Sequence, residues 1–332
     1  MRYIFALLSI LVIGSFTSCK QKTAQTSDES ADADIAKKIK AADFNADTAY
    51  YFVNEQVKFG PRVPNSKSHV KCASWLEATL KKYTPNVIVQ PFTAKAFDGT
   101  ILNCRNIIAS FNPKSTTRIL LCSHWDSRPF ADNDPDSAYH RTPIDGANDG
   151  ASGVGILLEI ARQLKISPAA MGVDILLLDG EDYGAPQDAG FTGSDDWALG
   201  SQYWSRYPHV PSYTARFGIL LDMVGAENAV FTLEGTSMYY APDFAQRVWN
   251  MGASIGYSDY FSTERTIAIT DDHVYINQLR QVPTIDIIQH DQLTQSGFYQ
   301  NWHTIKDNMK GISKPTLMAV GQTILTVVRN EK

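Results

Sequence analysis

Apolar residues recur along most of the chain in two spacings. Short runs that are apolar at consecutive positions predict strands covered on both faces, and they fall at 87–92, 106–111, 118–122, 173–178, 217–224, 230–233 and 283–288. Segments with helical spacing predict helices at 49–59, 70–83, 153–164, 195–203, 244–251 and 315–328. Their alternation predicts an α/β fold whose mixed, mostly parallel central sheet has helices on both faces.

The first 42 residues follow a different pattern. Residues 3–16 form an apolar run that is shorter than the roughly 20 residues needed to span a bilayer, and it fits a secretory signal. Small residues lead from the end of this run into Cys19, and the segment resembles a bacterial lipoprotein signal, which implies a signal peptide over 1–18 and a lipid on Cys19. The polar stretch 19–42 predicts a flexible, lipid-anchored tether. We therefore expect the protein in the bacterial cell envelope, in the periplasm, with the membrane and the face that carry the anchor left open. An ordinary signal peptide with an incidental Cys19 is the alternative.

Residues 43–332 show no internal repeat and no linker, so we expect one catalytic domain. Hydrophobic residues make up 44% and charged residues 20%, which excludes a disordered chain. The net charge of −5 argues against a nucleic-acid partner and leaves the lipid anchor as the expected membrane contact. Cys72, Cys104 and Cys122 are compatible with a disulfide or with buried thiols.

Acidic and histidine side chains follow several of the predicted strands. His124 follows 118–122, Glu181 and Asp182 follow 173–178, and Asp222 ends another strand. His303 lies beyond the last strand, and Asp149 lies in a glycine-rich loop that opens a helix. Ligands bind beyond the carboxyl ends of the strands in open α/β sheets. Carboxylates and imidazoles are zinc ligands, so we expect a metal site at this edge.

In order and placement these residues resemble the zinc aminopeptidases of the M28 type. The segments 221–226, 270–273 and 302–303 narrow the resemblance to the glutaminyl cyclases of the animal type and their bacterial relatives, over about 45–330. The resemblance implies a zinc aminopeptidase-like fold with one Zn²⁺. It also implies an acyltransferase that converts the N-terminal glutamine of peptides or proteins to pyroglutamate and releases ammonia.

The resemblance implies a role for each matching residue. The zinc ligands are matched by Asp149, Asp182 and His303, and the proton shuttle is matched by Glu181. The carboxylates that orient the shuttle and the substrate amine are matched by Asp222 and Asp271. The pocket residues are matched by Trp302 and His273. His124 matches a ligand of the second metal in the two-zinc aminopeptidases, which the cyclases retain without needing it as a ligand.

The chemistry supports these roles. The α-amine that attacks the side-chain amide is already tethered to it, so the enzyme needs a Lewis acid and a proton shuttle rather than a hydroxide. Glu181 is adjacent to the ligand Asp182, and repulsion from Asp222 and Asp271 would raise its pKa toward neutrality.

The sequence also departs from the animal pattern. Asp182 replaces a glutamate and is roughly 1.5 Å shorter, so the loop must bring its backbone closer to the metal. The animal pocket tryptophan has no clear match, although Trp197 is a candidate within the insertion 183–197. The animal cysteine pair is not reproduced.

Other interpretations remain open. Asp149 also fits a turn or a helix cap, Asp222 a strand end, and Asp272 a helix cap. A two-zinc aminopeptidase that uses His124 and Asp222 as ligands has every residue it needs. A non-catalytic peptide-binding lipoprotein would be expected to have lost one of the key site residues, and none is missing.

Overall fold

A computed structural model describes residues 42–190 and 194–332. The predicted signal peptide, Cys19 and nearly all of the predicted tether lie outside the described residues. Ala42 is buried, and its N–H donates to Thr326 Oγ1 at 3.0 Å, so packing already includes the residue before the predicted boundary at 43. Within the described part of the chain, no helix is both long and apolar enough to cross a bilayer.

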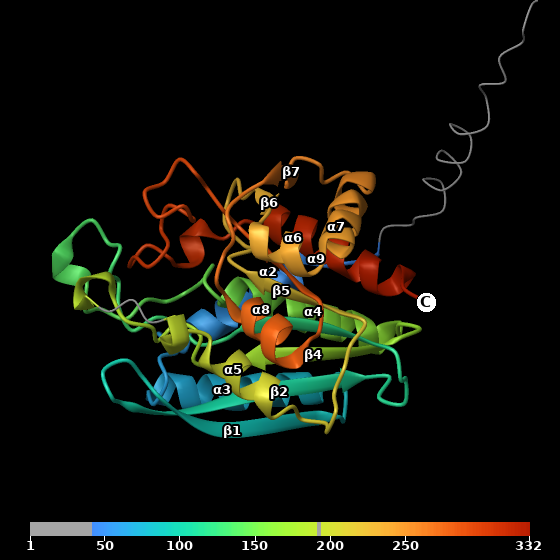
Figure 1. The fold of residues 1–332 in the computed structure, drawn as a ribbon, viewed down its shortest axis with the longest axis horizontal. Helices are drawn as coiled ribbons and strands as arrows, with labels where there is room; N and C mark the ends of the chain where they lie inside the picture. The colour runs from blue at the N-terminus through green and yellow to red at the C-terminus, as the bar shows by residue number, and fades with distance from the viewer. Residues whose placement is uncertain (1–41, 191–193) are drawn as a thin grey trace, which may run out of the picture. The chain divides into compact units, whose positions relative to one another are not determined.

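A six-stranded mixed sheet forms the centre of the fold (Figure 1). Its strands, in spatial order, are β1 (Val87–Lys95), β2 (Ile101–Phe111), β4 (Gly172–Leu178), β3 (Arg118–His124), β5 (Phe217–Asp222) and β8 (Thr284–Ile288). The last four run parallel to one another, whereas β2 is antiparallel to both of its neighbours. The mixed, mostly parallel sheet predicted from the sequence is confirmed. β6 (Phe231–Leu233) and β7 (Phe261–Arg265) make a separate small sheet.

The helices of the described residues include all six predicted ones, with different ends, and two short helices at 235–240 and 272–275 that were not predicted. They are α2 (Ala46–Val57), α3 (Lys67–Lys81), α4 (Ala151–Ile166), α5 (Leu199–Arg206), α6 (Gly235–Tyr240), α7 (Pro242–Ser254), α8 (Asp272–Tyr275) and α9 (Lys314–Asn330). Short 3-10 turns lie at Ser137–Tyr139, Gln187–Ala189, Ser194–Asp196 and Met309–Gly311, and a π-helical turn at Ile276–Arg280 follows α8. The helix predicted at 195–203 begins later, because Ala198 has a left-handed backbone with φ of 54°.

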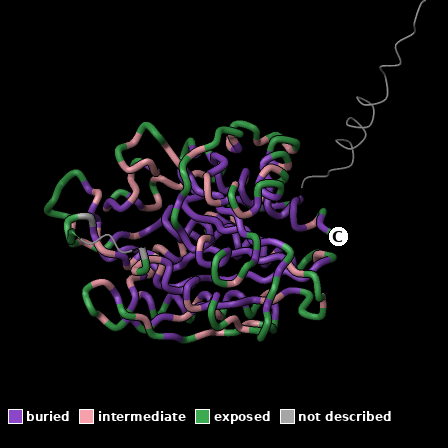
Figure 2. The backbone as a smooth tube through the Cα atoms, viewed as in Figure 1, coloured by how far each residue is buried: buried purple, intermediate pink, exposed green. Residues whose placement is uncertain are grey.

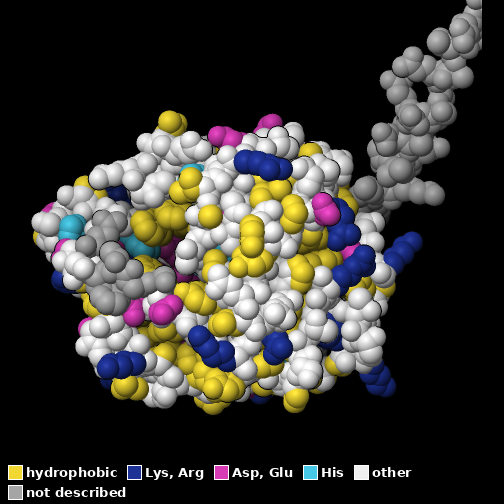
Figure 3. All heavy atoms as spheres, viewed as in Figure 1, with side chains coloured by type: hydrophobic (Ala, Val, Ile, Leu, Met, Phe, Trp, Pro, Cys, Tyr) yellow, Lys and Arg dark blue, Asp and Glu magenta, His cyan; other side chains and the backbone are white. Residues whose placement is uncertain are grey.

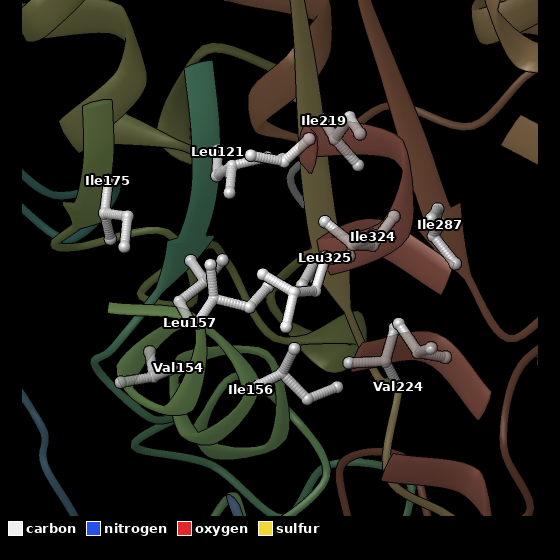
Figure 4. Packing of buried hydrophobic residues seen from close by; sticks show 14 of the residues in the cluster. Leu121, Val154, Ile156, Leu157, Ile175, Ile219, Val224, Ile287, Ile324 and Leu325 are labelled. Atoms are coloured by element: carbon white, nitrogen blue, oxygen red, sulfur yellow. The ribbon is translucent and has the colours of Figure 1, made fainter. Parts of the chain in front are cut away.

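Side chains alternate between the two faces of the sheet. Ile119 and Leu121 of β3 pack into the larger apolar core with α2, α4 and α9, whereas Leu120 and Cys122 pack into a smaller core. Trp204 of α5 and Ile276 contribute to that smaller core. Figure 4 shows the larger core between the sheet, α4 and α9, and Figure 2 shows that buried residues concentrate along these elements.

The same alternation decides which polar residues meet. In a strand, side chains two positions apart point to the same face of the sheet. His124 of β3, Asp222 of β5 and Asp286 of β8 therefore lie on the same face as the smaller core, which α5 and α8 cover. Figure 1 shows α5 and α8 next to one another. Polar side chains from separate parallel strands therefore lie close together on this face of the sheet.

The cysteines are buried free thiols in the structure, and no disulfide links Cys72, Cys104 and Cys122. Burial raises the pKa of Cys72 to about 12, so this thiol stays protonated at neutral pH. The second of the two possibilities that the sequence left open is the one observed.

Candidate active site

Asp149, Asp182 and His303 form a buried group of side chains that could hold a metal ion. One donor atom from each lies within 4.8 Å of the others. His303 Nε2 is 3.3 Å from Asp182 Oδ1 and 3.6 Å from Asp149 Oδ2. Asp182 Oδ2 is buried and has no hydrogen-bond partner, although a buried carboxylate oxygen ordinarily has one. A carboxylate–carboxylate–imidazole set with an oxygen left over fits a catalytic zinc, which has three protein ligands and an open position.

Three further carboxylates hold the segments that carry these residues. Asp307 accepts the backbone N–H groups of Asn148 at 2.8 Å and Asp149 at 3.1 Å. Asp126 accepts those of Glu181 at 3.1 Å and Asp182 at 3.2 Å. These contacts fix the two loops as outer-shell partners of metal ligands do.

The third carboxylate supports the histidine. Asp132 Oδ1 lies 3.4 Å from His303 Nδ1, the ring nitrogen that faces away from the other two metal-binding groups. Sequence reasoning missed Asp132 and Asp307, because neither lies in a motif. Asp126 had a signal, since it lies two residues after His124, just beyond a predicted strand.

His124 lies at the centre of a second group. Its Nε2 is 3.0 Å from Asp149 Oδ1 and 3.1 Å from Asp222 Oδ1, and the three residues form another buried metal-binding set. Burial by itself would lower the pKa of His124, but contacts with Asp126, Asp149 and Asp222 outweigh it and raise the pKa well above the usual value. The two sets share Asp149, as the ligands of a two-metal centre would.

A close approach of two elements makes this contact possible. A Cβ added at Gly150 would lie 2.4 Å from the His124 backbone oxygen and 2.6 Å from its ring. Only glycine therefore lets the start of α4 approach the end of β3. The N-cap of α4 is Gly150, which has no side-chain cap, so the Asp149 carboxylate is not used as a helix cap and faces the histidines.

Glu181 is half-buried and precedes Asp182, a member of the first group, in the chain. Desolvation raises its pKa well above the usual value, and the negative charges of Asp271 and Asp182 act in the same direction, while His124 opposes them. A carboxyl group whose pKa is raised can take up and release a proton near neutral pH. The electrostatics therefore match the proton-shuttle role expected of Glu181.

Asp222 and Asp271 approach this region from β5 and α8. Burial and the charge of Asp149 raise the pKa of Asp222 to about 7. Asp222 Oδ1 also accepts the N–H of Met223 at 2.9 Å. Asp222 thus binds the backbone at the end of β5, as the alternative interpretation expected, and also contacts His124. Asp271, rather than Asp272, caps α8 by accepting the N–H of Asp272. This corrects the cap expected from the sequence.

His273 is fully buried. Its Nε2 lies 3.3 Å from Glu234 Oε1 and its Nδ1 3.8 Å from Asp286 Oδ2. Glu234 in turn caps α6 by accepting the N–H groups of Ser237 and Thr236. The residue expected to line the pocket thus lies in a buried polar network next to Asp271.

Two tryptophans flank His303. The Trp302 ring centroid is 3.7 Å from that of His303, and the Trp197 ring lies nearly parallel to it at 6.0 Å and 5°. The structure thus places Trp197, the candidate for the unmatched pocket tryptophan, beside His303. Figure 3 shows acidic and histidine side chains recessed beside hydrophobic ones on one face of the molecule.

The known proteins that resemble this chain include glutaminyl cyclases and aminopeptidases. The model of the Peptidase family M28 matches residues 106–328. A solved glutaminyl cyclase of Bacteroides thetaiotaomicron, bound to N-acetylhistamine, is 53% identical over 88% of this chain and all of its own, with a TM-score of 0.86. A second structure from that organism, described as a leucine aminopeptidase precursor, is also 53% identical, over 89% of this chain and all of its own, with a TM-score of 0.85. The glutaminyl-peptide cyclotransferase of Gloydius blomhoffii is 28% identical over 74% of this chain and 67% of its own.

Proposed function

The chain belongs to peptidase family M28, and on that premise we propose that it is a glutaminyl-peptide cyclotransferase. It converts the N-terminal glutamine of peptides or proteins to pyroglutamate and releases ammonia. The observation that carries the proposal is the 53% identity to a solved glutaminyl cyclase across the whole length of that structure. The cyclotransferases of snakes and mammals among the relatives support it.

We propose that Asp149, Asp182 and His303 hold one Zn²⁺. The unpartnered Oδ2 of Asp182 is the observation that favours a cation between them. A zinc ion bound there would supply Lewis acidity toward the amide oxygen of the glutamine side chain. The remaining steps belong to the side chains around it.

Glu181 is the residue that moves the proton. As the α-amine nitrogen bonds to the side-chain carbonyl carbon, Glu181 takes a proton from that nitrogen. As the bond from this carbon to the amide nitrogen breaks, Glu181 returns the proton and ammonia leaves. One carboxyl group thus acts first as base and then as acid, for which a raised pKa is suited. Asp271 and Asp222 orient Glu181 and the amine, and Trp302 offers an apolar wall to the substrate.

A two-zinc aminopeptidase is the second candidate function. It is favoured by the His124, Asp149 and Asp222 group, which shares a carboxylate with the first group, and by the relative described as a leucine aminopeptidase precursor. In this reaction Glu181 would activate a water molecule rather than shuttle the proton of an amine.

One experiment separates the two functions. The purified protein is incubated with zinc and a peptide that begins with glutamine, and the products are weighed by mass spectrometry. A product lighter by the mass of ammonia, with its chain length intact, supports the cyclase. A product that has lost its first residue overturns the cyclase in favour of the aminopeptidase.

We also propose that the protein works in the bacterial cell envelope, lipid-anchored through Cys19. The support is the apolar run 3–16, followed by small residues that lead into this cysteine. Metabolic labelling with a radioactive fatty acid tests the proposal. Label should enter the full chain and be absent from Cys19→Ser, and equal labelling of both proteins would overturn it.

A further inference from the structure

A buried arginine that the reaction itself does not use lies directly behind the proposed metal ligands. Arg128 follows β3 and is 1% exposed. Arginine is rarely buried so completely unless its charge is paired. All of its guanidinium nitrogens contact groups belonging to the metal-binding region, and the face of the group is covered by Trp197, whose ring centroid is 4.6 Å from Cζ.

Two of these nitrogens bind the carboxylate that supports His303. Arg128 Nε donates to Asp132 Oδ1 and Nη2 to Asp132 Oδ2, each at 2.7 Å. A bidentate pair of this kind fixes orientation as well as distance. Because Asp132 Oδ1 is 3.4 Å from His303 Nδ1, the arginine sets the position of the group behind the histidine ligand.

The third nitrogen holds the turn that carries Asp182. Arg128 Nη1 donates to the backbone oxygens of Asp182 at 3.1 Å and Gly184 at 3.3 Å. It also lies 3.4 Å from Asp182 Oδ1. One guanidinium nitrogen thus contacts two backbone carbonyl groups and one carboxylate oxygen. It leaves Asp182 Oδ2 without a hydrogen-bond partner.

Trp197 packs this turn from outside. A Cβ added at Gly184 would lie 1.9 Å from the Trp197 ring, so the ring rests directly on the backbone of the turn. The turn is therefore held between the arginine and the tryptophan. This arrangement answers the question raised by the short ligand, because an aspartate reaches the metal only if its backbone lies closer than that of a glutamate by roughly 1.5 Å.

We propose that Arg128 is a positioning residue for the metal centre. It draws the 182–184 turn inward, so that aspartate rather than glutamate is the right length at position 182, and it holds Asp132 against His303. The inference deepens the proposed function, since it rests on Asp182 and His303 being zinc ligands.

The test measures zinc affinity by competition with a chelator, in a double-mutant design. Arg128→Met is expected to weaken zinc binding by about 10- to 100-fold, the usual effect of losing an outer-shell partner. Asp182→Glu alone is also expected to weaken zinc binding. While Arg128 and Trp197 hold the turn in place, the longer side chain would be too long for the distance between the backbone and the zinc. The combination Arg128→Met/Asp182→Glu is expected to bind zinc more tightly than Arg128→Met, since the released turn now suits the longer ligand.

Two results would overturn the inference. Zinc affinity of Arg128→Met within twofold of the unaltered protein would remove the positioning role. A double variant that binds no better than Arg128→Met would remove the link to ligand length. Activity is not the readout, so these outcomes do not depend on which reaction the enzyme catalyses.

Control variants separate positioning from folding and charge. Arg128→Lys keeps the positive charge, but its single nitrogen cannot hold Asp132 and the turn together. It should therefore also weaken zinc binding, and unchanged affinity would overturn the positioning role. This variant also avoids leaving Asp132 buried beside an uncharged residue. Arg141→Met is the matched control, because Arg141 is an exposed arginine of the neighbouring segment, paired with Asp188, and its zinc affinity should be unchanged.

Measurements on the unaltered protein distinguish a failure of the inference from a failure of the proposed function. Its zinc content and its action on a glutamine peptide are measured first. Zinc binding without cyclisation would reject the cyclase while the affinity series still tests Arg128. Zinc binding that persists in His303→Ala or Asp182→Ala would reject the proposed ligands, and the inference with them.

Discussion

Oδ1 of Asp149 lies 3.0 Å from Nε2 of His124. The other oxygen of the same carboxylate is 3.6 Å from Nε2 of His303. Asp149 therefore faces a histidine on each side, and each histidine belongs to its own metal-binding group. Whether the site works with one ion or two depends on what His124 does.

We expect one zinc ion per chain, and we expect His124→Ala to keep that ion. Catalysis should fall by less than about tenfold, because proton transfer by Glu181 does not pass through His124. Metal analysis and turnover of a glutamine peptide are the measurements. Two ions per chain, one of which is lost together with nearly all activity in His124→Ala, would favour the two-zinc peptidase.

Glu181→Gln should keep the fold and the zinc but lose about 10²- to 10⁴-fold in kcat. The amide has nearly the shape of the carboxyl group but cannot accept the amine proton. Metal content, melting temperature and kcat are measured together. Glu264→Gln, in an exposed segment of β7, is the matched control, and an equal loss in the two variants would contradict the shuttle role.

His303→Ala should lose bound zinc, because it removes one of three proposed ligands and leaves two carboxylates. Metal analysis after dialysis gives the answer. His290→Ala serves as control, since His290 is a half-buried histidine in the loop after β8 and should keep a full zinc complement. A full complement in His303→Ala would refute the ligand assignment.

Asp271→Asn should move the acidic limb of the kcat/KM profile to lower pH and lower the rate. Desolvation is the main cause of the raised pKa of Glu181, but the charge of Asp271 adds to it. Removing that charge makes Glu181 easier to ionise. Asparagine still caps α8, so the helix should survive. A limb that stays in place would show that Asp271 does not act on Glu181.

The metal-free protein should lose stability as the pH rises from about 5 to 8. Burial and the charge of Asp149 raise the pKa values of Asp222 to about 7 and of Asp307 to about 8. A carboxyl whose folded pKa is raised stabilises the fold below its unfolded pKa, and this contribution is lost as pH passes the folded pKa. Melting temperatures in chelator should therefore fall over this range.

Zinc should restore much of that loss at pH 8, because a cation offsets the repulsion between the ionised carboxylates. Asp307→Asn should flatten part of the pH dependence in chelator, since the amide has no charge to acquire. A melting temperature in chelator that rises between pH 6 and pH 8 would contradict this account.

The sequence was informative where burial is regular. The strands β3 and β4 are apolar at successive positions and were recognisable, whereas β7 is largely exposed and polar and left no apolar run. The helix α8 has four residues, which is too few for helical spacing to be visible. The fold class therefore followed from the pattern, whereas β7 and the short helices α6 and α8 did not.

The site divides in the same way. Residues at strand ends, such as His124 and Asp222, could be placed because the sheet edge collects them. The contact of Arg128 with Asp182 joins positions 54 residues apart, and neither spacing nor composition indicates it. A side chain that acts through the backbone of another loop leaves no periodic signal, so the support of the metal centre had to come from the structure.

The alternation of side chains along the sheet also limits where this family of enzymes tolerates changes in chain length. Deleting one residue from the middle of β5 would turn Asp222 toward the apolar core and bring Met223 into its place. A change of length in the exposed turn at Ser137–Tyr139 would leave the facing of every strand unchanged. Gain and loss of residues during divergence should accordingly be confined to the loops, while the strands keep their length.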